Sequence, residues 1–155
     1  MMIIHITVPY HILMSRLDEI IGRGVNPEIY LSAADLDTCQ DADVRPLGDA
    51  LKKAGLSYTF HAPFMDLAPG GVDSKIRRAT QERLEHVLHL AALIRPAAVV
   101  FHPEYDPWRH DEVLDLWFQG SIAMWTPLVK EAEKIAVTLA LELSLIHISE
   151  PTRPY

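Results

Sequence analysis

Cysteine is nearly absent from this 155-residue chain: Cys39 stands alone, so no internal disulfide can form. A chain without disulfides is typical of a reducing compartment, and we expect the cytoplasm. Cys39 lies in a polar stretch and is interpreted as an ordinary loop thiol. No stretch approaches the roughly 18 apolar residues of a transmembrane helix. The first residues also lack the basic segment of a signal peptide, so we expect no membrane partner.

Positive charge is scarce as well. The 14 lysines and arginines are outnumbered by 21 aspartates and glutamates, which gives a net charge of -7. This balance disfavours a nucleic-acid partner, because phosphate neutralisation needs clustered cationic side chains. A glycine-rich loop is also missing after the first apolar run, where Val8, Pro9 and Tyr10 stand. A dinucleotide-binding fold would need such a loop to cradle the phosphates.

What the sequence does contain is a recurring pattern, in which an apolar run ends in a residue able to bind a metal ion. Residues 58–60 precede His61, residues 98–101 precede His102, and residues 137–141 precede Glu142. A proline follows each histidine within two residues. It helps to end the strand, because proline cannot donate a hydrogen bond to a sheet.

Apolar runs alternate with segments of helical periodicity along the chain. The expected strands are residues 3–8, 28–32, 58–61, 97–102 and 137–142. Helices are expected over 13–21, 47–54, 76–94 and 111–134, with Asp73 or Ser74 as the N-cap of the third. The last segment could hold one or two helices, because Gly120 could divide it and Pro127 suits the first turn of a helix better than its middle. Residues 33–46 are expected to form a polar loop. Continuous apolar runs are typical of parallel strands buried on both faces.

Two folds have this alternating order, an open doubly wound sheet and a (β/α)8 barrel. The missing glycine-rich loop favours the barrel. Because a whole barrel takes roughly 250 residues, we expect an α/β fold that is a partial TIM barrel. It would hold the first five parallel strands with the intervening helices, over residues 1–142. Residues 143–155 lack periodicity and resemble the translation of a sequencing adapter, so we expect a non-native tail there.

The carboxyl ends of parallel strands form the ligand site in such folds, and His61, His102 and Glu142 all fall there. Two imidazoles and a carboxylate are a usual ligand set for zinc, manganese or cobalt. Three protein ligands leave positions open for water or substrate. Alternatively, each histidine could be a hydrogen-bonded structural residue, and Glu142 could pair with a neighbouring cation. The shared placement favours a divalent metal site.

Three aromatic residues follow the third and fourth predicted strands: Phe64, Tyr105 and Trp108. They could form an apolar wall over a sugar-like substrate, or they could pack beneath their own loops. The remaining histidines are poorer ligand candidates. His86, His89 and His110 are expected to face solvent, His11 lies near the strand ends, and the direction of His5 is undecided.

These motifs resemble the xylose isomerase-like TIM barrel superfamily, which holds sugar phosphate isomerases and epimerases and metal-dependent apurinic endonucleases. The resemblance covers residues 1–142. It rests on His61-Ala62-Pro63-Phe64, Val100-Phe101-His102-Pro103 and Leu139-Ala140-Leu141-Glu142. It implies that His61, His102 and Glu142 are metal ligands and that Glu142 also acts as a base.

Two positions depart from the pattern of this superfamily. Glu104 stands where a glycine often follows the histidine–proline pair, and Leu143 stands where an asparagine often follows the glutamate. The sequence resembles only the N-terminal part of such a barrel. Strands six to eight, which would supply further ligands, are missing from it.

Three functional hypotheses remain open. In the first, the parent protein is a divalent-metal-dependent sugar or sugar-phosphate isomerase or epimerase that acts on a small carbohydrate, with Glu142 as the catalytic base. In the second, it is a zinc-dependent apurinic endonuclease-like phosphodiester hydrolase, favoured by two histidines and disfavoured by the acidic charge. In the third, the chain is an inactive fragment that self-associates through its unpaired sheet edges.

Overall fold

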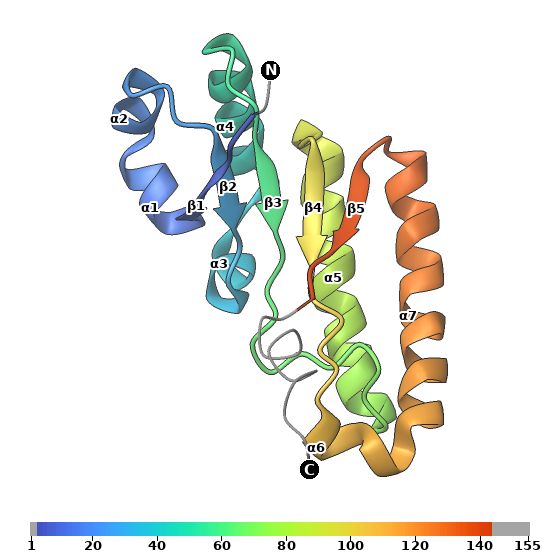
Figure 1. Cartoon of the computed structure of the whole chain (residues 1–155). Coiled ribbons are helices and arrows are strands. Elements are labelled where there is room, and N and C mark those ends of the chain that lie inside the picture. The colour runs from blue at the N-terminus through green and yellow to red at the C-terminus, as the bar shows by residue number, and fades with distance from the viewer. Residues whose placement is uncertain (1–2, 144–155) are drawn as a thin grey trace.

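The structure is a computed structural model that describes residues 3–143 of the chain. These residues form one sheet of five parallel strands in the order β1-β2-β3-β4-β5, so strands that follow one another in sequence are neighbours in space (Figure 1). The α/β class and the five parallel strands predicted from the sequence are confirmed. Apart from Leu143, the predicted tail lies outside the described residues.

The strands are short and all five predicted ones are present. They are β1 Ile6–Pro9, β2 Pro27–Tyr30, β3 Thr59–His61, β4 Ala98–Phe101 and β5 Thr138–Leu141. The helices are α1 Tyr10–Ser15, α2 Leu17–Gly22, α3 Ala33–Thr38, α4 Asp41–Lys53, α5 Ser74–Ile94, α6 Pro107–His110 and α7 Leu114–Lys134, with a 3-10 turn, η1, at Asp111–Val113. Among the described residues, no helix combines the length and the hydropathy that crossing a bilayer requires.

The helices cover one face of the sheet, as right-handed crossovers between consecutive strands require. Figure 1 shows α4 and α5 behind the sheet and α7 along its side. The strand residues of this face are Ile29, Phe60, Val99 and Phe101, none more than 1% exposed. They form one core cluster with residues of α4, α5 and α7. The face of the sheet that packs on the helices is therefore the buried one.

The opposite face, called the inner face below, carries the alternate residues of β2 to β5. It includes Glu28, Tyr30, His61, Val100 and Ala140, all of which are half-buried. The expectation that the strands are buried on both faces is therefore wrong for the described residues. Successive side chains of a strand point to opposite faces, and the helices cover only one of them.

The predicted loop over residues 33–46 is also wrong, because it contains α3 and the start of α4. The Ser32 side chain accepts a hydrogen bond from Asp35 N, while Asp35 accepts one from Ser32 N. Asp43 accepts in the same way from Gln40 N at the start of α4. The aspartates are thus N-terminal capping residues, which satisfy otherwise unpaired amides and complement the helix dipole.

The structure divides one predicted helical segment and decides an alternative that the sequence left open in another, where one or two helices were expected over 111–134. The segment predicted over 13–21 is divided at Arg16 into α1 and α2, whereas α7 continues unbroken through Gly120 and contains Pro127 in its interior. A Cβ atom at Gly120 would lie 3.3 Å from Gly70 O, so this glycine allows the loop after β3 to approach α7. Pro127 is tolerated on the exposed side of the helix.

Candidate metal centre

The three predicted ligands lie together at the carboxyl ends of β3, β4 and β5. His61 ends β3, and His102 and Glu142 follow β4 and β5 directly. The register pairs His61 with Val100 and Val100 with Ala140. Because side chains two residues apart share a face, His102 and Glu142 join His61 on the inner face of the sheet.

Main-chain hydrogen bonds hold these strand ends in place. Leu31 N donates to His61 O at 3.0 Å, Ala62 N to Val100 O at 2.9 Å and Glu142 N to Phe101 O at 2.8 Å. The backbone of each candidate ligand is therefore part of the sheet or directly beside it. A site built on strands in this way is positioned more rigidly than one carried on a loop.

The candidate ligand atoms converge on one point. The His61 and His102 Nε2 atoms are 2.9 Å apart, and His102 Nε2 is 3.8 Å from Glu142 Oε2. One ligand atom from each of the three residues lies within 4.8 Å of the others. Ligands at about 2.1 Å from an ion lie at most about 4.2 Å apart, so the exposed Glu142 side chain would turn inward to bind. Two imidazole nitrogens and a carboxylate oxygen fit a divalent ion.

The surroundings of His102 favour its neutral form. Burial lowers the pKa of His102 below its usual value, and proximity to His61 lowers it further, while the charges of Glu142 and Glu28 act in the opposite direction. A neutral imidazole is the form that binds metal ions. The electrostatics of the site therefore agree with its geometry.

A glutamate lies behind each histidine. Glu28 Oε1 is 3.0 Å from His61 Nδ1, and Glu104 Oε1 is 3.9 Å from His102 Nδ1. Glu28 was not recognised as a site residue from the sequence. In the sequence, only its charge within an otherwise apolar strand sets Glu28 apart. The register of β2 and β3 is needed to show that it lies beside His61.

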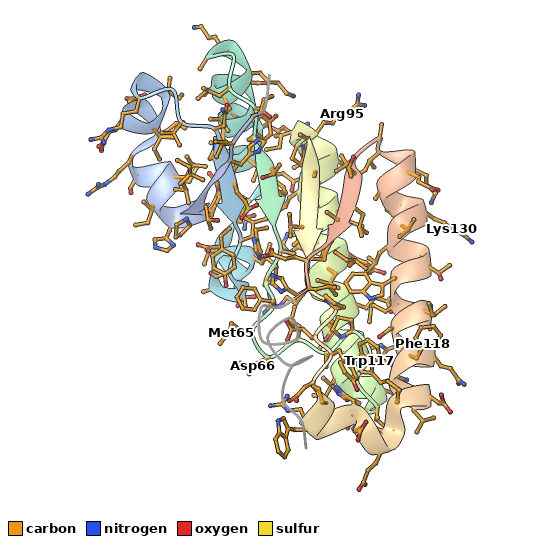
Figure 2. All side chains as sticks on the ribbon, viewed as in Figure 1. Met65, Asp66, Arg95, Trp117, Phe118 and Lys130 are labelled. Atoms are coloured by element: carbon orange, nitrogen blue, oxygen red, sulfur yellow. The ribbon has the colours of Figure 1, made fainter. Side chains whose placement is uncertain are left out.

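The predicted aromatic wall is divided in the structure. The Phe64 ring centroid lies 4.7 Å from that of His102 and 5.9 Å from that of His61, so Phe64 covers the histidine pair. Tyr105 packs its ring on Trp117 at 4.8 Å, and Trp108 is 99% exposed. Figure 2 labels Met65, on the loop after β3 that also carries Phe64, and Trp117, against which Tyr105 packs. Substrate contact by Phe64, Tyr105 and Trp108 stays a prediction.

Two expectations about residues outside the site are wrong. His110 does not face solvent: it is buried, and its Nδ1 accepts a hydrogen bond from Asp106 N at 3.1 Å, at the start of α6. Cys39 is not a loop thiol but the buried C-cap residue of α3. Burial raises the pKa of its thiol, which opposes nucleophilic reactivity.

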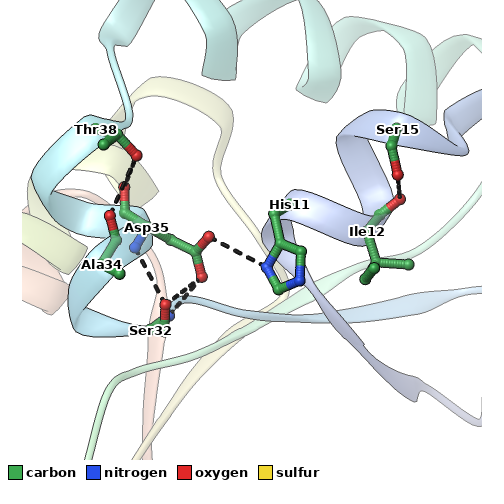
Figure 3. Close-up of polar contacts among 7 residues, drawn as sticks. All are labelled: His11, Ile12, Ser15, Ser32, Ala34, Asp35 and Thr38. Atoms are coloured by element: carbon green, nitrogen blue, oxygen red, sulfur yellow. Dashed lines mark hydrogen bonds and ion pairs between the residues drawn. The ribbon is translucent and has the colours of Figure 1, made fainter.

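Three further histidines of the described residues, His5, His11 and His89, have local polar partners. His89 Nε2 lies 2.9 Å from Asp41 Oδ1 on the surface, and His5 Nε2 lies 2.9 Å from Ser57 Oγ. His11 Nδ1 is 3.5 Å from Asp35 Oδ1, as Figure 3 shows. Because the second Asp35 oxygen accepts from Ser32 N at 2.9 Å, this carboxylate is engaged in capping α3.

A family model described as xylose isomerase-like TIM barrel matches residues 26–145 of the chain. Among curated proteins, an uncharacterised protein of Methanocaldococcus jannaschii is 30% identical over 86 residues, which make up 53% of this chain and 28% of that protein.

Several solved structures are similar in fold. A D-tagatose 3-epimerase-like protein has a TM-score of 0.72 at 20% identity, covering 89% of this chain and 52% of that one. A Thermus thermophilus protein soaked with zinc chloride has a TM-score of 0.69 at 24% identity, covering 92% and 57%. A D-psicose 3-epimerase solved with D-fructose has a TM-score of 0.64 at 14% identity, covering 86% and 50%. The chain thus spans about half the length of these structures. Together with the match to the barrel family model, this confirms the prediction of a partial barrel.

Proposed function

The chain belongs to the xylose isomerase-like TIM barrel family, and on this basis we propose that the whole protein is a divalent-metal-dependent sugar or sugar-phosphate isomerase or epimerase. The observation that carries the proposal is the convergence of His61, His102 and Glu142 at neighbouring strand ends. Structural neighbours described as a D-tagatose 3-epimerase-like protein and a D-psicose 3-epimerase support a small carbohydrate as the substrate.

The three residues have distinct roles in this proposal. His61 Nε2, His102 Nε2 and one Glu142 oxygen would hold the ion, with zinc, manganese and cobalt all compatible with the ligand set. When bound, a divalent ion polarises a substrate carbonyl and an adjacent hydroxyl. The second Glu142 oxygen accepts the proton from the carbon beside the carbonyl, which leaves an enediol-type intermediate; delivering that proton to the former carbonyl carbon completes an isomerisation. Epimerisation would instead need a proton from a second acid on the opposite face of the carbon that lost one. Phe64 shields the histidine pair from water, and Tyr105 and Trp108 contact the substrate.

Proton exchange with solvent tests this function directly. The whole protein is incubated in D2O with Mn2+ and a panel of ketoses, and deuterium at the carbon beside the carbonyl is measured by mass spectrometry. We expect incorporation with wild-type protein and at least about 100-fold slower incorporation with Glu142→Gln, because removing a general base costs roughly this much. Glu82→Gln, which changes an exposed glutamate of α5, is the matched control. No exchange with any ketose would contradict the proposal.

A second candidate function is phosphodiester hydrolysis at abasic DNA. The pair of imidazole nitrogens 2.9 Å apart favours it, because two histidines suit a zinc ion that activates water. The net charge of -7 disfavours it, since DNA binding depends on cationic side chains. Cleavage of an abasic duplex that is lost on chelation, without proton exchange on ketoses, would favour this candidate over the first.

A further inference from the structure

Glu28 lies on β2 beside the candidate metal centre. The register pairs Tyr30 with His61 and Glu28 with Thr59, so Glu28 is diagonal to His61 on the inner face, within reach of a long side chain. Glu28 Oε1 is 3.0 Å from His61 Nδ1, and the two side chains are only 22% and 12% exposed. This contact is therefore largely shielded from water.

The chemistry of the contact fixes the tautomer of His61. A carboxylate can only accept hydrogen bonds, so the proton must be on His61 Nδ1. The neutral ring then has its free lone pair on Nε2, the atom that lies 2.9 Å from His102 Nε2. Because the partner of one ring nitrogen determines which nitrogen is available as a ligand, Glu28 leaves Nε2 ready to bind.

Neighbouring residues of β1 and β2 hold this arrangement in place. Thr7 Oγ1 donates to Glu28 Oε1 at 2.8 Å from the paired position on β1. The Tyr30 ring meets the His61 ring edge-on, with centroids 5.8 Å apart and an interplanar angle of 83°. The His61 ring is thus held by a hydrogen bond through Glu28 and by packing against Tyr30.

We propose that Glu28 is a positioning residue, which sets the Nδ1–H tautomer and the ring orientation of His61 so that Nε2 binds a divalent cation. The inference deepens the proposed function and rests on the metal centre described there. Glu104 offers a built-in comparison, because its carboxylate is 3.9 Å from His102 Nδ1, beyond the length of a hydrogen bond. It places a similar charge near the site without the same close contact.

Cobalt binding by the whole 155-residue chain tests this role. Co2+ is titrated into wild-type, Glu28→Gln and Glu28→Ala protein and followed by visible absorption. We expect Glu28→Ala to weaken binding by about 10- to 100-fold, the usual effect of removing a partner of a metal-bound histidine. Glu28→Gln should weaken it less, because its amide oxygen can still accept from Nδ1–H. Glu28→Leu, which keeps a side chain of similar size but cannot accept a hydrogen bond, decides the matter if Glu28→Ala fails to fold.

Two controls separate positioning from simple loss of charge. Glu82→Gln should bind Co2+ as wild type does, and Glu104→Ala should lose less affinity than Glu28→Ala. Equal losses of Co2+ affinity in Glu28→Ala and Glu104→Ala would show that only the loss of a nearby charge matters, and would overturn the inference. In metal-free protein, 15N NMR should show His61 in the Nδ1–H form in wild type and a mixture of tautomers in Glu28→Ala.

The outcomes also distinguish this inference from the proposed function. If wild-type protein binds Co2+ while the Glu28 variants keep both its affinity and its His61 tautomer, only the positioning role is overturned. If wild-type protein binds no Co2+, the metal centre itself is overturned, and the positioning role with it.

Discussion

Histidine residues in this chain differ in how far burial affects their protonation. Burial is the main cause of a lowered pKa at His86, His102 and His110. Of these, His110 lies away from the candidate ligands in sequence and has a defined partner, since its Nδ1 accepts from Asp106 N. It is therefore the best single residue for linking protonation to the stability of the fold.

Substituting His110 should reduce the dependence of stability on pH. Its folded-state pKa is below the usual value of 6.5, so the folded state binds this proton more weakly than the unfolded chain. The stability that the neutral His110 gives to the folded state is fully present above about pH 6.5 and is lost as the pH falls through the folded-state pKa. We expect the free energy of unfolding of His110→Gln, from urea denaturation, to fall less steeply than that of wild type between about pH 7 and pH 5. Trp108→Ala, at an exposed site on the same helix, should retain the wild-type slope.

The candidate ligands and their positioning residue differ in how visible they are in the sequence. His61, His102 and Glu142 could be predicted because each directly follows a recognisable apolar run, and strand ends of a parallel sheet meet at one edge. Glu28 lies 33 residues from His61. Their contact depends on the register of two strands, which no local pattern reveals.

At the scale of helices and strands, α4 and α5 pack closely at Gly48. A Cβ atom there would lie 2.5 Å from Ile94 Cγ2 and 2.6 Å from Ile94 Cβ. Ile94 is fully buried at the end of α5, so it has little room to move. Glycine at this position permits an approach between the two helices that any larger residue would prevent.

Gly48→Ala should therefore destabilise the chain. We expect a loss of about 1–3 kcal/mol in the free energy of unfolding, the usual cost of overpacking a core, despite the better helix propensity of alanine. Gly22→Ala is the control, because a Cβ at Gly22 meets nothing within 4 Å and should be neutral or stabilising by up to about 1 kcal/mol. Urea denaturation measures both, and equal stability of the two variants would contradict close packing at Gly48.

Helix boundaries were less predictable than strand positions for physical reasons. The aspartates of residues 33–46 are equally compatible with turns and with helix N-termini, and the capping pairs Ser32–Asp35 and Gln40–Asp43 select the helices. Gly120 and Pro127 disfavour a helix locally, yet packing of α7 on α5 and β5 keeps it continuous. Tertiary contacts outweigh local propensity in both places.

At the scale of the whole molecule, the alternating order of apolar runs and helical segments was enough to predict the parallel sheet. It could not show that the inner face is only half-buried, because an apolar run has the same appearance whichever face is covered. In the described part of the chain, β1 and β5 are the edge strands, and Ile6 and Leu141 on them are exposed. Self-association through these edges stays a prediction.

Anomalous diffraction at the zinc edge from crystals of the protein grown with Zn2+ tests the metal centre most directly. We expect one ordered peak at about 2.0–2.2 Å from His61 Nε2, His102 Nε2 and a Glu142 oxygen, with the Glu142 side chain turned inward. An empty site at these three residues, with zinc bound only at other histidines such as His86 and His89, would contradict the proposed centre.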